Sequence, residues 1–253
     1  MITADLTGRK ALITGAASGI GFGTAKLFAR LGAMVAINDL PDNPRLEEAV
    51  AVIMAAGGRA IAAPGNVGDP VEARTMARKA AEDMGGMDYL INNAATPGTK
   101  STIPATDFDR QDEAFWQRLV SVNQIGPFRC LQAVSPFLKA AHGAVVNTTS
   151  IGGFGGGASS SVYASTKAAL INLTKEWARA LGPEVRVNAI APGMVDSDWE
   201  CRFPESAYTS ALERAPLHRI GTASDYAEVI LFLCAGAGYV TGHTIVVDGG
   251  LTC

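Results

Sequence analysis

The chain has 253 residues, of which 48% are hydrophobic and 18% are charged, and its formal net charge is −3 at pH 7. This composition excludes a disordered chain, and the length suffices for one large domain with its own core. A slightly acidic protein lacks the basic field by which proteins usually hold phosphates of DNA or RNA, so we expect no nucleic-acid partner.

Neither the first residues nor the apolar stretches suggest a targeting or membrane segment. Residues 1–10 carry Asp5 and no apolar run, and the most apolar stretch, 229–240, is shorter than the roughly 20 residues of a membrane span. We therefore expect a cytoplasmic protein that does not bind membranes. The four cysteines and three histidines are scattered without ligand spacing, so no metal site is predicted.

Short apolar runs alternate with longer segments of helical period along the whole chain. The runs predict strands buried on both faces, at residues 11–14, 34–38, 60–63, 89–92, 144–148, 186–190 and 244–247. Helices are expected at about residues 19–31, 44–57, 69–85, 111–140, 161–182 and 223–235. This alternation predicts a single α/β domain over residues 1–253, with a parallel sheet between two layers of helices.

Two irregular segments interrupt this alternation. Residues 152–161 (GGFGGGASSS) connect a predicted strand to the next helix, where open α/β sheets bind ligands, so we interpret them as a loop that lines a pocket. Residues 193–210 contain the aromatic residues Trp199, Phe203 and Tyr208. Aromatic side chains in so long a connection predict a lid over a substrate, and the alternative is a structural flap over the core.

A glycine-rich turn, TGAASGIG, begins at Thr14 directly after the first predicted strand. Glycines let the chain turn tightly and let its amides approach a pyrophosphate at the N-terminus of the following helix. The turn therefore predicts a dinucleotide site, with a plain tight turn as the alternative. The residues expected to contact the dinucleotide here are Gly15, Ser18, Gly19, Ile20 and Gly21.

An acidic residue, Asp39, ends the second predicted strand, eighteen residues after Gly21. A carboxylate at this place accepts hydrogen bonds from both ribose hydroxyls of an adenosine and repels a 2′-phosphate. Ser18, Leu40 and Pro41 supply no cation that would hold such a phosphate. The sequence therefore predicts NAD rather than NADP, and the alternative is that Asp39 only caps the following turn.

Tyr163 and Lys167 are four residues apart on a predicted helix, so both side chains leave the same helix face. A nearby ammonium favours the phenolate and lowers the pKa of a tyrosine from its ordinary value near 10. The pair alone is weak evidence, because two surface residues of a helix fit it as well. Its position adds weight: Ser150 ends the fifth predicted strand thirteen residues earlier, and Asn123 lies on the preceding long helix.

In order and spacing, these residues resemble the short-chain dehydrogenase/reductase family, from about Thr7 to Gly250. The motifs that carry the resemblance are Thr14-Gly15-x3-Gly19-x-Gly21, Asn92-Asn93-Ala94, Asn147-x-x-Ser150, Tyr163-x3-Lys167 and Pro192-Gly193. The resemblance implies a doubly wound Rossmann fold with seven parallel strands in the order 3-2-1-4-5-6-7. It also implies a homotetramer that pairs the long helices holding Asn123 and Tyr163, with a dimer as the alternative.

The resemblance further implies a catalytic tetrad. Tyr163 would exchange a proton with the substrate oxygen, and Lys167 would lower the pKa of Tyr163 and hold the nicotinamide ribose. Ser150 would hydrogen-bond the same substrate oxygen, and Asn123 would fix a water that passes the proton onward. Further NAD contacts are expected from Asn66, Val67, Asn93, Ala94, Pro192, Gly193, Val195 and Ser197, and further substrate contacts from Gly152, Phe154 and Trp199.

Three positions depart from the family pattern. Ala95 stands where a glycine is usual, Asn66 replaces an aspartate that meets the adenine amino group, and Ser197 replaces a threonine near the carboxamide. Asn66 still offers a carbonyl oxygen as an acceptor, so we expect weaker NAD binding rather than lost binding.

The sequence thus predicts an NAD-dependent oxidoreductase that interconverts a secondary alcohol and a ketone. The expected pocket is mostly apolar, which favours a bulky or cyclic apolar substrate. One alternative acts on 3-oxoacyl groups of an acyl carrier protein: Arg129 lies on a suitable helix for an acidic carrier, whereas Glu184, Asp39 and the net charge of −3 oppose it. The other alternative, a non-catalytic NAD-binding regulator, does not need the intact tetrad.

Overall fold

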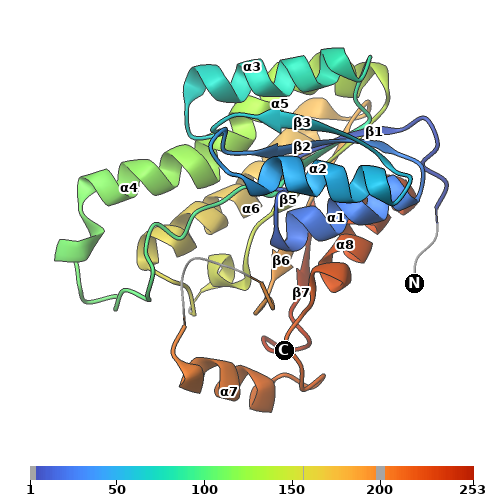
Figure 1. Ribbon diagram of the computed structural model, residues 1–253. Helices are drawn as coiled ribbons and strands as arrows, with labels where there is room; N and C mark the ends of the chain where they lie inside the picture. The colour runs from blue at the N-terminus through green and yellow to red at the C-terminus, as the bar shows by residue number, and fades with distance from the viewer. Residues whose placement is uncertain (1–3, 156, 198–202) are drawn as a thin grey trace.

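A parallel sheet of seven strands, in the order β3-β2-β1-β4-β5-β6-β7, runs through the centre of the protein (Figure 1). The structure is a computed structural model that describes residues 4–155, 157–197 and 203–253. Its strands are β1 (Lys10–Ile13), β2 (Met34–Asp39), β3 (Arg59–Pro64), β4 (Tyr89–Asn92), β5 (Ala144–Thr148), β6 (Arg186–Pro192) and β7 (Thr244–Val247). The seven strands and their order confirm the predicted doubly wound fold.

The strand β1 is the point from which the chain builds the sheet in both directions. Leu12 lies opposite Ala36 of β2 on one side and opposite Leu90 of β4 on the other. Where the order of strands reverses in this way, the connections after neighbouring strands diverge and leave a crevice outside the carboxyl ends of the strands. Gly15 and Asp39 lie at this edge, just after β1 and at the end of β2.

Helices cover both faces of the sheet and enclose two hydrophobic cores. One core packs Phe28, Leu46 and Ile230 from helices α1, α2 and α8 against the sheet, and the other packs Met76 and Val134 from α3 and α5. Figure 1 shows α1 and α8 together on one side of the sheet and α3 and α5 together on the other. These helices are α1 (Gly19–Arg30), α2 (Arg45–Ala55), α3 (Pro70–Asp83), α5 (Gly126–Ala140), α6 (Ser161–Leu181) and α8 (Ala223–Leu231).

The helix expected at residues 111–140 is divided. A 3-10 turn η1 (Asp109–Gln111) precedes helix α4 (Glu113–Leu119), and a π-helical segment η2 (Val120–Ile125) joins α4 to α5. Pro127 stands in the first turn of α5 and has no backbone N–H, so the regular α-helical hydrogen bond cannot form at this residue. The π-helical hydrogen bonds just before this proline therefore leave fewer backbone groups unpaired than a continuous α-helix through residue 127 would.

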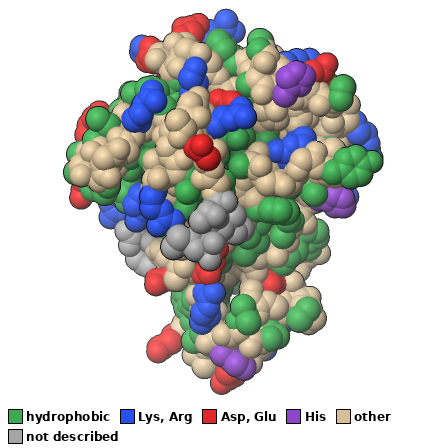
Figure 2. All heavy atoms as spheres, turned by 90° about the vertical axis from the view of Figure 1, so that its right-hand side faces the viewer, with side chains coloured by type: hydrophobic (Ala, Val, Ile, Leu, Met, Phe, Trp, Pro, Cys, Tyr) green, Lys and Arg blue, Asp and Glu red, His purple; other side chains and the backbone are tan. Residues whose placement is uncertain are grey.

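A helix that the sequence pattern did not predict, α7 (Glu205–Arg214), lies within the long connection after β6. It follows Pro204 and carries Glu205 in its first turn, two features that favour a helix start. Figure 1 shows α7 at the bottom of the molecule. In the space-filling view of Figure 2, the lower end of the molecule projects below the wider main body. Within the ranges that the structure describes, no helix has the length and apolar character needed to span a membrane.

Candidate active site

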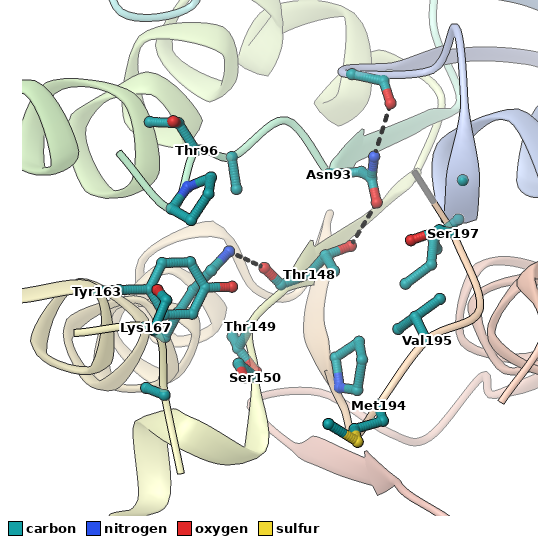
Figure 3. Close-up of a pocket in the computed structure, with 18 of the residues that line it drawn as sticks. Asn93, Thr96, Thr148, Thr149, Ser150, Tyr163, Lys167, Met194, Val195 and Ser197 are labelled. Atoms are coloured by element: carbon teal, nitrogen blue, oxygen red, sulfur yellow. Dashed lines mark hydrogen bonds between the residues drawn. The ribbon is translucent and has the colours of Figure 1, made fainter. Parts of the chain in front are cut away.

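A cavity of about 1140 Å³ opens at the carboxyl ends of the strands and extends toward α7. Most residues predicted to bind NAD or substrate line this one cavity. They are Gly15, Ser18, Gly19, Ile20, Asp39, Asn66, Val67, Asn93, Ala94, Ser150, Tyr163, Lys167, Pro192, Gly193, Val195 and Ser197. Figure 3 shows Tyr163, Lys167 and Ser150 on one side of the cavity and Val195 and Ser197 on the other.

The turn between β1 and α1 depends on its glycines. Gly15 and Gly19 have φ angles of +60° and +54°, a conformation that favours glycine. A Cβ on Gly15 would lie 2.8 Å from the Cα of Ala94, and a Cβ on Gly21 would collide with the carbonyl oxygen of Gly15. Gly21 therefore serves the tight packing of the turn, although it does not line the cavity.

The first residues of α1 have no side-chain cap, because the Ser18 hydroxyl makes no capping hydrogen bond. The backbone N–H groups of Gly19 and Ile20 make no hydrogen bond within the described part of the chain. Unpaired amides at the positive end of a helix dipole attract a phosphate. The turn therefore has the donors that a dinucleotide's pyrophosphate requires.

The carboxylate of Asp39 faces the same cavity and is held by three donors. Its Oδ2 accepts from the amide of Ala17 at 3.2 Å, and its Oδ1 accepts from the amide of Leu40 and from Nδ2 of Asn43, both at 2.9 Å. An ionised carboxyl accepts about four hydrogen bonds, so one acceptor position remains on Oδ2 for a ribose hydroxyl. Asn43, which the sequence did not single out, lines the cavity beside it.

Two asparagines of the cofactor half are already engaged with the backbone. Nδ2 of Asn93 donates to the carbonyl oxygens of Thr14 and Gly15, at 3.0 and 2.9 Å, and so ties the end of β4 to the glycine turn. Oδ1 of Asn66 accepts from the amide of Gly68 at 2.8 Å. The predicted adenine contact of Asn66 therefore has to use the second lone pair of this oxygen or the side-chain NH₂.

Lys167 is fully buried below the ring of Tyr163. Its Nζ lies 5.6 Å from the centroid of that ring and donates to the carbonyl oxygen of Thr148 at 2.7 Å (Figure 3). Burial away from water lowers the pKa of Lys167 to about 7. The N-terminus of α6 fixes Tyr163 in turn, because the Ser160 hydroxyl caps the helix by accepting from the Tyr163 amide at 3.0 Å.

Ser150 lies two residues after the end of β5 and caps the short 3-10 helix η3 (Ile151–Phe154). Its Oγ accepts from the amide of Gly152 at 3.1 Å, which leaves its O–H free to donate to a substrate oxygen. Ser150, Tyr163 and Lys167 thus come from two elements, the end of β5 and the first two turns of α6. They place a hydroxyl, a phenol and an amine at one wall of the cavity.

The fourth predicted tetrad residue, Asn123, lies in η2 and does not line the cavity. Both ends of its amide bind the loop after β4: Oδ1 accepts from the amide of Thr96 at 2.8 Å, and Nδ2 donates to the Thr96 carbonyl at 2.9 Å. Nδ2 also lies 3.3 Å from Oγ1 of Thr166 on α6. Asn123 therefore braces helix α6 and this loop, and its role toward a water stays a prediction.

The predicted substrate residues are placed unequally. Gly152 is buried beneath Ala158 and Ser150, Phe154 is 58% exposed, and neither lines the cavity. Trp199 lies outside the described residues. The assignments of these three residues to the substrate stay predictions.

Comparisons with known proteins agree with this geometry. The sequence model of a family described as enoyl-(acyl carrier protein) reductase matches residues 15–252. A 3-oxoacyl-acyl-carrier-protein reductase of Thermotoga maritima is 38% identical over 249 residues, which are 97% of this chain and 98% of that protein. The chain belongs to the short-chain dehydrogenase/reductase family.

Two solved structures of such dehydrogenases are similar over their full length and differ in their cofactor. A short-chain dehydrogenase of Burkholderia cenocepacia in complex with NADP is 33% identical, with a TM-score of 0.88 over 99% of this chain and all of that one. A 3-oxoacyl-acyl carrier protein reductase of Brucella melitensis with bound NAD is 32% identical, with a TM-score of 0.86 over all of this chain and 97% of that one. The protein is therefore an oxidoreductase of this family with a nicotinamide dinucleotide site.

Membership in the family does not account for several residues that line the cavity. Arg118 of α4, Tyr208 and Arg214 of α7, and the C-terminal residues Leu251 and Thr252 belong to this group. None of them belongs to the family motifs, and each reaches the cavity through the packing of its element. A charged residue on a helix otherwise indicates a solvated face, so the sequence offered no signal for the two arginines.

Proposed function

We propose that the protein is an NAD(H)-dependent oxidoreductase that interconverts a secondary alcohol and a ketone, with Tyr163 as the general acid/base. The observation that supports this most directly is the buried amine of Lys167 below the ring of Tyr163, next to Ser150 at the cavity wall. Bound NAD supplies the hydride acceptor, and NADH the hydride donor, of such a reaction. Gly19, Ile20 and Asp39 have the amides and the carboxylate that would hold it.

The side chains of the protein position the substrate oxygen and transfer its proton. Ser150 donates a hydrogen bond to the substrate oxygen and holds it beside the Tyr163 phenol, which gives that oxygen a proton or takes one from it. The charged form of Lys167 favours the phenolate through its positive charge, and its anchor on the Thr148 carbonyl keeps Nζ in place during the proton transfer. The absorbance of NADH, followed with a panel of ketones and secondary alcohols, tests the assignment.

Cofactor choice gives the first prediction. The Asp39 carboxylate lies in the cavity without a described cation beside it, so it should repel a 2′-phosphate by at least about 1.4 kcal/mol, or about tenfold in kcat/KM. We expect kcat/KM with NADH to exceed that with NADPH by this factor. Asp39→Ala should narrow the gap, and Asp42→Ala, at an exposed neighbouring position, should not. Equal efficiencies in the parent enzyme would contradict the NAD assignment.

A second candidate, the reduction of 3-oxoacyl thioesters, is favoured by the relative that is 38% identical and by the reductase of Brucella melitensis. Its ketone would undergo the same chemistry at Tyr163. The residue expected to dock an acidic carrier, Arg129, is unsuited to that task, because it is buried and donates to the carbonyl oxygens of Val67, Gly68 and Ser121. The comparisons thus favour a thioester substrate, whereas the buried Arg129 cannot serve as a docking residue for a carrier protein.

We also propose that residues 193–210 form a lid. Phe203 and Tyr208, in edge contact with their ring centroids 6.5 Å apart, line the cavity from this segment. The amides of residues 205–210 should exchange with solvent quickly in the free protein and slowly with NADH and a substrate analogue bound. Hydrogen exchange measured by mass spectrometry checks this expectation. Full protection without any ligand would identify a structural flap instead.

A homotetramer is the assembly that we propose for the chain. Trp116, Ile125 and Phe128, on α4, η2 and α5, expose a large part of their apolar surface, as do Phe232 and Val246 of η4 and β7. The π-helical segment η4 spans Phe232–Gly236. Two separate apolar faces on one chain suit an assembly with two kinds of interface. The mass of the protein in solution distinguishes a tetramer from a dimer.

A further inference from the structure

The part of the cavity away from the glycine turn is cationic. The charged residues that line the described cavity are Asp39, Arg118, Lys167 and Arg214. Asp39 is bound to Ala17 and Asn43 at the adenosine side, and Lys167 is buried at the catalytic wall. The two arginines therefore remain for the substrate, and no described carboxylate in the cavity neutralises them.

Arg118 is held in place at the end of α4 without the use of all its donors. One guanidinium nitrogen, Nη2, donates to the carbonyl oxygen of Gly98 at 2.7 Å, and the group lies 5.6 Å from the centroid of the Phe115 ring. Its Nε and Nη1 make no hydrogen bond within the described ranges. A fixed guanidinium with free N–H groups at a cavity wall is suited to bind an anion.

Arg214 is the last residue of α7, and its side chain makes neither a hydrogen bond nor an ion pair in the part of the chain that the structure describes. Its neighbour Ala215 packs on the C-terminal segment, where a Cβ added to Gly249 would lie 3.8 Å from the Ala215 Cβ. Leu251 and Thr252 of that segment line the same cavity. Arg214 thus stands where the lid helix meets the end of the chain.

The two faces of α7 differ in charge. Ala207, Ala211 and Arg214, at helical spacing, line the cavity together with Tyr208, whereas Glu205 and Glu213 are exposed and do not line it. Two alanines, Tyr208 and the last arginine of the helix thus line the cavity, whereas Leu212 and the two described carboxylates do not. Arg214 is itself exposed, so it reaches the cavity at its solvated rim.

We propose that Arg118 and Arg214 bind an anionic group of the substrate, a phosphate or a carboxylate, remote from the carbonyl that is reduced. This inference rests on the proposed function and adds a substrate class to it: a ketone or secondary alcohol with an apolar body and an anionic end. It refines the expectation of an uncharged apolar substrate. A phosphate would come from a thioester carried on phosphopantetheine, and a carboxylate from a free oxo acid.

Two matched pairs of ketones test the proposal with NADH as reductant. Acetoacetyl-coenzyme A and acetoacetyl-N-acetylcysteamine share one ketone, but only the first carries phosphates; 4-oxopentanoate and its methyl ester differ in a carboxylate. We expect the enzyme to favour the anionic member of one pair by about tenfold or more in kcat/KM. The pair that shows this preference identifies the anion. Added salt should weaken the preference, because it screens charges at a solvated rim.

Arg214→Gln should remove most of the preference and leave kcat/KM for the neutral ketone nearly unchanged, and Arg214→Lys should retain part of it. Arg78→Gln, on the exposed face of α3, is the matched control and should change nothing. Turnover of neutral ketones with no preference for either anion would overturn the inference and leave the proposed function intact. No turnover of any ketone would overturn the proposed function. In that case the dissociation constants of acetoacetyl-coenzyme A and of 4-oxopentanoate decide the inference: one of them should rise about tenfold in Arg214→Gln, and unchanged values for both overturn it.

Discussion

Tyr163→Phe is expected to lower turnover about 100-fold or more while the fold and NADH binding survive. The substitution removes one oxygen from a ring at the cavity wall and leaves the ring and the helix cap at Ser160 in place. A substrate hydroxyl must lose its proton as its hydride leaves, and Tyr163 is the phenol that lies above the buried amine of Lys167. Steady-state kinetics and NADH fluorescence titration measure the two expected effects separately.

Tyr239→Phe is the control for this substitution, because the Tyr239 side chain is fully exposed and does not line the cavity. It should keep parent turnover. In the parent, the rate of alcohol oxidation should rise with pH, because the phenolate form of Tyr163 is the one that accepts the substrate proton. Near-parent turnover in Tyr163→Phe, on a substrate that the parent uses, would remove Tyr163 from the mechanism.

Lys167→Met is expected to change how the stability of the fold depends on pH. Burial lowers the pKa of Lys167 to about 7, whereas an unfolded chain keeps this proton up to a pKa near 10.5. From roughly pH 7 to pH 10 the unfolded chain therefore binds more protons, and this site makes the free energy of unfolding rise with pH by up to about 1.4 kcal/mol per unit. The variant lacks this contribution, so its free energy of unfolding should gain less over the same range.

Urea denaturation measures the free energy of unfolding of the parent and of Lys167→Met. The two proteins are compared at several pH values in this window, without cofactor. Lys139→Met, at an exposed position in the last turn of α5, controls for the loss of a lysine as such and should follow the parent. Parallel curves for the parent and Lys167→Met would show that Lys167 keeps an ordinary pKa in the fold. NADH binding should also weaken in Lys167→Met if Nζ of Lys167 contacts the ribose.

Much of the fold could be predicted because its signals are local. A strand buried on both faces, such as residues 144–148, is a short apolar run, and the helix that begins at Ser161 shows its own period and cap. The order of strands came from the resemblance to a family and not from such runs. The cavity residues at the strand ends, Gly15, Asp39 and Ser150, follow from this topology, because parallel strands bring their carboxyl ends to one edge.

The rest depends on contacts between segments far apart in the sequence. The helical period of residues 111–140 predicted one long helix. The break depends on Pro127, which a helical period does not weigh, and on the packing of Asn123 on Thr96. Helix α7 was missed because the aromatic residues of 193–210 show no regular period. The exposure of Phe154 is likewise a matter of tertiary position, and its sequence neighbourhood of glycines does not determine it.

The π segment η2 has a consequence for how this region tolerates change. Compared with an α-helix, such a segment contains one inserted residue, which rotates everything after it by about 100° around the helix axis. With this rotation, Phe115 and Leu119 of α4 face Val162 in a small cluster of their own, while Val134 and Leu138 of α5 face the sheet. Deleting one residue from 120–125 would turn one of these two apolar faces to water, so the extra residue sets the angular register of the whole region.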